Sequence, residues 1–115
     1  QGLSPLGCNK IGNEVARSYS QYMCKNGCFD HRCDGQSPGD RLSSAGLAWD
    51  IYAENIAYGQ GNPAIVMEER MNSDGHRRNI LKTGLTEMAV GHIICDGEPY
   101  WTMVLVTPAG ERTFD

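Results

Sequence analysis

The 115-residue sequence lacks any apolar run that approaches the length of a transmembrane helix, which needs about 20 consecutive apolar residues. It also lacks internal repeats, low-complexity tracts and a glycine-rich phosphate-binding loop. We therefore expect a soluble chain without a membrane span and without the nucleotide site of a Rossmann fold. The length suits a single domain over residues 1–115, large enough for a hydrophobic core and too small for two.

Positive charge is also scarce. Ten Lys and Arg stand against 14 Asp and Glu, so the formal net charge is −4 at pH 7. Proteins that bind nucleic acid present a basic surface to the phosphate backbone, and the only adjacent basic pair in this chain is Arg77-Arg78. The charge balance therefore predicts no nucleic-acid partner.

Cysteine is abundant for so short a chain. The five cysteines are Cys8, Cys24, Cys28, Cys33 and Cys95. This density is typical of disulfide-bonded proteins in an oxidising compartment, and the odd count leaves one thiol over. The chain opens at Gln1-Gly2 without a charged or apolar leader. We interpret it as the mature or trimmed form of a secreted protein.

The cysteines of the 24–33 segment allow two interpretations. The pattern C-x3-C-x2-H-x-C contains ligand types that bind zinc. In a secreted protein, disulfides explain the same residues without a metal, and this interpretation is favoured. We expect one pairing inside the segment and a long-range bridge from Cys8 or Cys95, although spacing alone does not fix the connectivity.

Helical patterns fill most of the first two thirds. Apolar residues recur at helical spacing over 9–24, with Tyr19 and Tyr22 expected to face the core. A second helix should begin at Ser37-Pro38-Gly39-Asp40, turn Leu42 and Ala45 inward, and end at Gly46.

The pattern between residues 48 and 71 is weaker. Residues 48–57 suggest an irregular, partly extended crossing, and Asn62-Pro63 suggests the start of a third helix that reaches about Met71. One face of that helix would carry Ala64, Met67 and Met71. The charge run at 68–70 is interpreted as a solvated face.

The last third has the two-residue period of strands. Residues 88–95 alternate, Asp96-Gly97 is a strong hairpin signal, and 100–107 is a dense β-branched and aromatic run. Such an apolar strand favours a sheet packed between helices. Helices precede strands along the chain, so the prediction is an α+β fold with a mainly antiparallel sheet. Tyr100 and Trp101 are expected in the core, and His92 is expected to have a structural role.

The stretch MNSDGHRRNIL at 71–81 is the first candidate for a functional site. Ser73 can cap a helix by accepting a bond from the amide of His76, and the positive end of the helix dipole favours a neutral imidazole there. A neutral imidazole can bind a metal or accept a proton. The alternative is a capped helix whose His only fills space. Upstream, Glu54 lies inside an apolar run, where an unpaired charge is costly.

Four motifs together resemble a known family. FDH at 29–31, AENIA at 53–57, MNSDGHRRNIL at 71–81 and GEPYWTMVL near the end occur in the order found in the CAP superfamily. This superfamily contains the cysteine-rich secretory, antigen-five and pathogenesis-related proteins, also called SCP-like extracellular domains. The likeness is strongest to its compact, bacterial-style branch. It covers nearly the whole chain and implies secretion and a three-layer α/β/α sandwich.

The resemblance also implies a central cavity where histidines and acidic residues converge, often around zinc or another divalent cation. Carried over position by position, the metal ligands are His31, Glu54 and His76. The chain departs from the family pattern at Ala53, where glycine is usual, at Arg70 for tryptophan, and at Met103 for glutamine. The family's preceding N-terminal helix is expected to be largely absent.

Three functions follow from these expectations. The first is a non-catalytic binding module that recognises a lipid or sterol, a cell-wall component or an extracellular protein. The second is an extracellular, protease-like hydrolase, in which Glu54, Ser73 and His76 have the residue types of an acid–base–nucleophile set. The third is a structural or toxin-like domain whose cavity is vestigial. No nucleophile elbow supports the second hypothesis.

Overall fold

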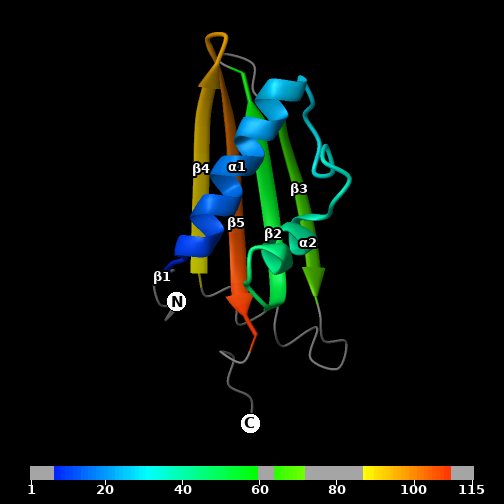
Figure 1. Ribbon diagram of the computed structural model, residues 1–115, viewed down its shortest axis with the longest axis vertical. Helices are drawn as coiled ribbons and strands as arrows, with labels where there is room; N and C mark the ends of the chain where they lie inside the picture. The colour runs from blue at the N-terminus through cyan, green and yellow to red at the C-terminus, as the bar shows by residue number, and fades with distance from the viewer. Residues whose placement is uncertain (1–6, 60–63, 72–86, 110–115) are drawn as a thin grey trace.

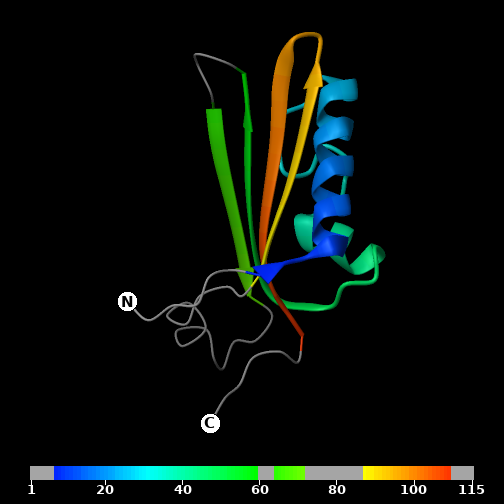
Figure 2. The same cartoon turned by 90° about the vertical axis from the view of Figure 1, so that its left-hand side faces the viewer.

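The structure is a computed structural model that describes residues 7–59, 64–71 and 87–109. Two helices pack on one face of a five-stranded sheet, as the two perpendicular views show (Figures 1 and 2). The elements are β1 (Gly7–Cys8), α1 (Lys10–Asn26), α2 (Pro38–Ser44), β2 (Trp49–Tyr58), β3 (Ala64–Met71), β4 (Glu87–Cys95) and β5 (Glu98–Pro108). No helix within these described ranges is both long and apolar enough to span a bilayer.

The strand order is β1-β4-β5-β2-β3, and every neighbouring pair except β1 with β4 is antiparallel. The α+β class and the mainly antiparallel sheet are therefore confirmed. Because β2 lies between β5 and β3, a side chain in its middle that points toward the helices is covered on all sides. Glu54 occupies such a position.

Helix α1 forms where the sequence predicts it. The Asn9 side chain caps its start by accepting a bond from the Gly12 amide, and Gly27 ends it in the left-handed conformation with φ 59°. Its buried stripe includes Ala16, Tyr19 and Met23, which recur every three or four residues. Tyr22 lies off this stripe and is 39% exposed, so the expectation that it faces the core is wrong.

Helix α2 also begins as predicted. Ser37 and Asp40 form a reciprocal capping box, and Pro38 occupies the first helical turn. Leu42 is fully buried. The expectation for Ala45 is wrong because α2 ends at Ser44, and Ala45, the C-cap, is exposed.

Residues 48–57 are not an irregular crossing, because most of them belong to β2. The strand pairs with β5 on one side and β3 on the other, and Ile51 to Glu54 are four consecutive buried residues. A strand covered on both faces does not alternate between apolar and polar residues, and its two-residue period is hidden in the sequence.

The third predicted helix is also wrong, since residues 64–71 form β3. It pairs with β2 over eight residues from Ile51↔Met71 to Tyr58↔Ala64. Ile65 and Met67 point away from the helices and are 72% and 56% exposed, whereas Val66 packs against the core. Pairing with the open edge of β2 overrides the helix propensity of this short segment.

The β4–β5 hairpin is confirmed. Asp96 and Gly97 form its turn with φ values of 51° and 79°, the positive values that a tight two-residue hairpin turn requires. Tyr100 is half-buried, but Trp101 is 43% exposed on the opposite face, so the core assignment fails for Trp101. His92 lies opposite Trp101 in the register, and the two rings stack 4.0 Å apart, which agrees with a structural role for His92.

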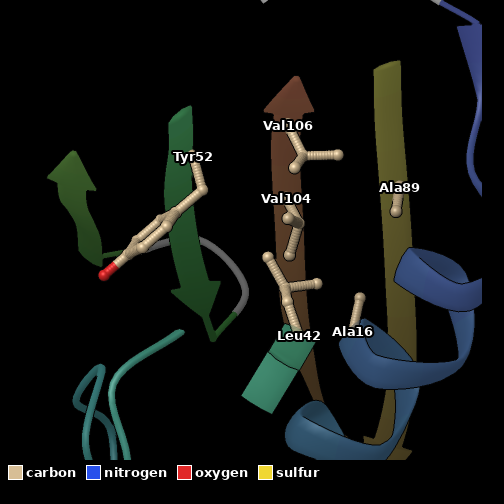
Figure 3. Packing of buried hydrophobic residues seen from close by; sticks show 6 residues of the cluster. All are labelled: Ala16, Leu42, Tyr52, Ala89, Val104 and Val106. Atoms are coloured by element: carbon tan, nitrogen blue, oxygen red, sulfur yellow. The ribbon is translucent and has the colours of Figure 1, made fainter. Parts of the chain in front are cut away.

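The core lies between the helices and the sheet. One cluster joins both helices to the three central strands through six buried side chains (Figure 3): Ala16, Leu42, Tyr52, Ala89, Val104 and Val106. A second cluster contains Tyr19, Met23 and Ile56. Together they fix both helices on one face of the sheet.

Two disulfides lie at the end of the fold where α1 and β4 end. Cys28 pairs with Cys33 inside the predicted segment, and Cys24 pairs with Cys95 across 71 residues. Cys8 is a free, exposed thiol. These pairings confirm the disulfide interpretation and exclude a zinc site built on the cysteines of the 24–33 segment.

Candidate functional site

His31 and Glu54 meet in the interior. His31 lies in the loop between α1 and α2, and Glu54 lies in the middle of β2. The imidazole Nδ1 is 2.6 Å from Glu54 Oε1. The two residues are only 7% and 1% exposed, so the hydrogen bond between them is shielded from water. The structure thus brings together two of the residues that the sequence singles out.

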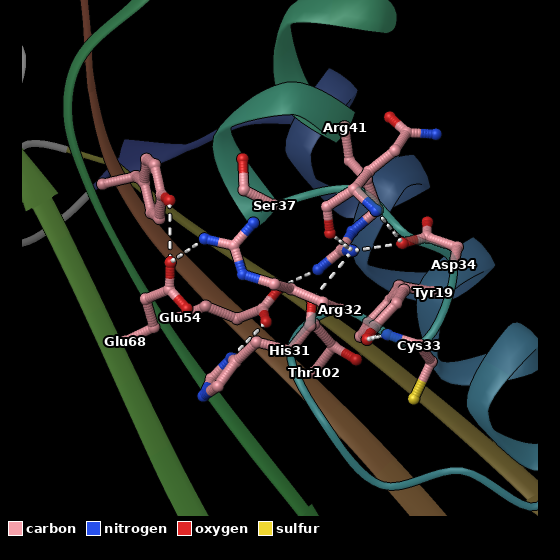
Figure 4. A network of polar contacts seen from close by, with 12 residues as sticks. Tyr19, His31, Arg32, Cys33, Asp34, Ser37, Arg41, Glu54, Glu68 and Thr102 are labelled. Atoms are coloured by element: carbon pink, nitrogen blue, oxygen red, sulfur yellow. Dashed lines mark hydrogen bonds and ion pairs between the residues drawn. The ribbon is translucent and has the colours of Figure 1, made fainter.

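A third residue, Arg41 of α2, completes this centre. Its Nη2 donates to Glu54 Oε2 at 2.8 Å, so both carboxylate oxygens are bonded (Figure 4). Its Nη1 lies 3.0–3.1 Å from three further acceptors: the His31 carbonyl, Asp34 Oδ1 and the Gln36 carbonyl. Arg41 is 8% exposed.

The charged side chains of this centre are paired with one another. A buried carboxylate is tolerated only when it is paired and hydrogen-bonded, and Glu54 has both a guanidinium and an imidazole N–H as partners. The guanidinium in turn lies between two carboxylates, Glu54 and Asp34. The Tyr19 ring covers it, with the guanidinium carbon 3.4 Å from the ring centroid.

Tyr19 also holds the loop that carries His31. Its hydroxyl donates to the Asp30 carbonyl and accepts a bond from the Cys33 amide at 2.9 Å. Burial raises the pKa of the Tyr19 hydroxyl to about 12, so the group stays protonated and can donate at neutral pH. The Cys28–Cys33 disulfide closes the same loop.

A second, more exposed set of contacts borders the centre. Arg32 forms a 3.6 Å ion pair with Glu68 of β3, and the Tyr52 hydroxyl donates to Glu68 Oε2 at 3.1 Å. Burial and the nearby Glu68 carboxylate raise the pKa of Tyr52. The interpretation of Glu68 as part of a solvated face is therefore wrong, because its carboxylate is partly buried and bonded to two side chains. The Glu69 and Arg70 side chains lie outside the described residues.

Two polar atoms of the centre, His31 Nε2 and Arg41 Nε, have no partner within the described ranges. His31 Nε2 is buried and makes no hydrogen bond there. It is directed away from the Arg41 guanidinium (Figure 4). A buried ring nitrogen whose opposite nitrogen is held by a carboxylate is the arrangement of metal-binding histidines. In this respect His31 fits a divalent metal such as zinc.

Glu54 fits a metal less well than the sequence suggests. Its two oxygens are already bonded to His31 and Arg41. Among the residues that the structure describes, no three His, Cys, Asp or Glu side chains are arranged to hold a metal ion. Ser73 and His76, the other candidates, lie outside the described residues.

Sequence reasoning missed Arg41. The signal that could have found it is Glu54 itself, because a carboxylate predicted inside an apolar run requires a buried cation. Arg41 stands one helical turn beyond the Ser37 cap. As a basic residue in a helix that the sequence predicts, Arg41 could have been proposed as that cation.

Comparisons with known proteins agree with this fold. The family model described as "Cysteine-rich secretory protein family" (CAP) matches residues 1–106. The chain is 37% identical over 107 residues to the uncharacterized protein YkwD of Bacillus subtilis (strain 168), covering 92% of this chain and 41% of that protein. It is 33% identical to the uncharacterized membrane protein YlbC of the same organism, covering 78% of this chain and 26% of that protein. The chain thus spans less than half the length of both curated relatives.

Two solved structures are also similar. An extracellular protein containing a SCP domain from Bacillus anthracis str. Ames superposes with a TM-score of 0.64 and 25% identity, over 91% of this chain and 34% of that one. An outer surface protein from Borrelia burgdorferi superposes with a TM-score of 0.69 and 16% identity, over 92% and 80% of the two chains. The second likeness concerns the fold alone. With the family match over residues 1–106, these findings show that the chain belongs to the CAP family of cysteine-rich secretory proteins.

Proposed function

We propose that this protein is a secreted binding module whose central site holds a divalent metal ion, with zinc as the first candidate. The observation that carries the proposal is the buried His31–Glu54 pair, which leaves His31 Nε2 without a partner among the described residues. Two features support secretion. The fold contains two disulfides, and the similar SCP-domain protein from Bacillus anthracis is described as extracellular.

In this proposal His31 and His76 provide the metal-binding nitrogens. Glu54 accepts the Nδ1–H of His31 and holds the ring in place. A bound zinc ion supplies a positive charge and an open coordination position for an oxygen of the ligand. The ligand class is a lipid or sterol, a cell-wall component or an extracellular protein.

Thermal unfolding with and without zinc at neutral pH tests the metal. At a zinc concentration 100 times the Kd, binding stabilises the folded state by about 2.7 kcal/mol, which a melting curve resolves easily. We expect this stabilisation to disappear in His31→Ala and in His76→Ala. His92→Ala is the matched control, since His92 is exposed on β4 and stacks on Trp101, far along the chain from either motif. A wild-type protein whose melting temperature does not change would refute the metal site.

Sedimentation assays distinguish the ligand classes. The protein is mixed with phospholipid vesicles with and without sterol, and separately with peptidoglycan sacculi. Retention that is lost in His31→Ala assigns the ligand to that class. Retention that survives in this variant would contradict a role for the central site in ligand binding.

The hydrolase hypothesis has less support. A general base must lie within reach of the substrate proton, whereas Glu54 is 1% exposed and its two oxygens are directed at His31 and Arg41. Turnover of peptide, ester or glycan substrates that is lost in His76→Ala, with folding retained, would favour the hydrolase over the binding module. The hypothesis of a vestigial cavity predicts neither zinc stabilisation nor turnover.

A further inference from the structure

The role of Glu54 depends on what its two oxygens already bind. Oε1 lies 2.6 Å from His31 Nδ1, and Oε2 lies 2.8 Å from Arg41 Nη2. At 1% exposure, the carboxylate has no open side toward solvent. Each oxygen keeps a second lone pair, but a carboxylate that turned to place it on a metal would weaken its bonds to two buried donors, the His31 ring and the Arg41 guanidinium.

Arg41 connects the parts of the site that come from different elements. One end of its guanidinium binds Glu54 of β2, and the other binds the main-chain carbonyl of His31. It therefore fixes both the carboxylate and the backbone of the histidine that the carboxylate must meet. Asp34 and the Tyr19 ring hold the guanidinium itself in place.

This arrangement determines which ring nitrogen of His31 carries the proton. Glu54 Oε2 is ion-paired with the guanidinium, and a carboxylate in such a pair only accepts hydrogen bonds. In a ring with a single N–H, Nδ1 must then be the donor, and Nε2 keeps its lone pair. His31 Nε2, which is buried and has no partner among the described residues, is thus the ring nitrogen able to bind a metal.

We infer that Arg41 is the positioning residue of the site: through Glu54 it holds the His31 ring with its Nδ1–H on the carboxylate and with Nε2 turned away and able to bind. Glu54 is then an orienting group and not a metal ligand, in contrast to the ligand set that the sequence suggests. The tautomer stands independently of the proposed function. Only the binding of a metal at Nε2 rests on the proposed function.

The tautomer is measured directly on the wild-type protein without metal. Two-bond proton–nitrogen correlation spectra of the histidine side chains distinguish the protonated nitrogen of each ring. His31→Ala and His92→Ala assign the signals. We expect His31 in the Nδ1–H form at neutral pH. A wild-type His31 protonated at Nε2 would overturn the inference without any variant of Arg41.

Variants then test the part of Arg41. Arg41→Lys keeps the charge but cannot bind Glu54 and the His31 carbonyl with a planar fork, so we expect the Nδ1–H form to be partly lost. Arg32→Lys is the matched control: Arg32 is an adjacent loop arginine with a half-exposed side chain, paired with Glu68 and not with Glu54. An Arg41→Lys protein that is folded, as judged by its amide spectrum, and keeps the wild-type tautomer would refute the positioning role.

Zinc separates this inference from the proposed function. On adding zinc to the wild type, the Nε2 signal of His31 should shift while the Nδ1–H signal persists, and Arg41→Lys should weaken zinc binding about 10–100-fold. The Nδ1–H tautomer without any zinc effect would refute the metal and keep the positioning role. Zinc binding accompanied by loss of the Nδ1–H signal would refute the positioning role and keep the metal.

Discussion

At the scale of single residues, the molecule contrasts two kinds of ion pair. Arg41 and Glu54 are 8% and 1% exposed, and both also bond to other residues of the centre. If one of them were replaced, the charge of the other would stay buried and could not be solvated. Arg32 and Glu68 are 3.6 Å apart at the edge of the same region, and the Arg32 side chain is 47% exposed. The two pairs should therefore differ greatly in their effect on stability.

We expect Arg41→Met to lower the free energy of unfolding by about 3–5 kcal/mol, because it leaves the Glu54 charge buried and unpaired. Arg32→Met should cost less than about 1 kcal/mol, as is usual for exposed pairs. Urea unfolding of both variants checks the prediction. Equal losses of unfolding free energy in the two variants would contradict the conclusion that Arg41 compensates the buried charge of Glu54.

The buried tyrosine predicts how stability depends on alkaline pH. Burial raises the Tyr19 pKa to about 12 in the folded state, whereas an unfolded tyrosine ionises near pH 10. The contribution of this group is therefore fully present below pH 10 and is lost as the pH rises toward 12.

Tyr19→Phe should reduce the slope of the unfolding free energy against pH between about 10 and 12. Tyr22→Phe is the control, because Tyr22 lies on the same helix and is 39% exposed. The measurement is urea unfolding at several alkaline pH values. The Tyr19 assignment fails if both variants keep the wild-type slope.

At the scale of elements, the contact between α1 and the sheet determines where the site forms. Helix α1 crosses β4 at Gly91, where an added Cβ would overlap the backbone of Ala16 and Arg17. Ser20 strengthens this crossing by donating to the Gly91 carbonyl at 3.0 Å and by bonding to Thr102 at 2.7 Å. The position of α1 in turn fixes Tyr19 above Arg41.

Gly91→Ala should destabilise the fold by about 3 kcal/mol, the upper end for overpacking, because helix backbone cannot move aside as a side chain can. Val90→Ala is the comparison, since Val90 is the adjacent residue and points to the other face of the sheet, where it is 39% exposed. Its cost should be below about 1 kcal/mol. Thermal unfolding measures both, and a neutral Gly91→Ala would show that α1 does not pack as described.

At the scale of the whole molecule, the two disulfides constrain the chain over different lengths. Cys24–Cys95 joins the end of α1 to the end of β4 across 71 residues, whereas Cys28–Cys33 spans five and closes the loop that carries His31. In the chain-entropy account, the longer closed loop stabilises the fold more.

Replacing Cys24 and Cys95 by serine should cost about 4 kcal/mol, and replacing Cys28 and Cys33 by serine about 2 kcal/mol. The zinc response should show the opposite order, because only the short disulfide constrains the His31 loop. Melting curves of both double variants with and without zinc provide the check. A short-loop variant with the wild-type zinc response would show that the disulfide does not support the site.

The sequence by itself determined the features that depend on neighbouring residues. The Asn9 and Ser37 caps, the Asp96-Gly97 turn and the alternation of β4 are local signals, and the structure confirms the elements that they predict. The family motifs also indicated that His31 and Glu54 converge, although as metal ligands and not as the hydrogen-bonded pair that the structure shows. Ser73 and His76 remain predictions.

Only the tertiary structure decided the features that depend on distant segments. Residues 64–71 became a strand because β2 offers an edge to pair with. Strand β2 itself was hidden because Ile51 to Glu54 are all buried, on both faces of the sheet, so no two-residue pattern remains. Arg41 is a helix residue like many others until the fold places it beside Glu54, 13 positions along the chain. The partner of a buried charge is the residue that the fold brings beside it, and the order of residues along the chain does not show which residue that is.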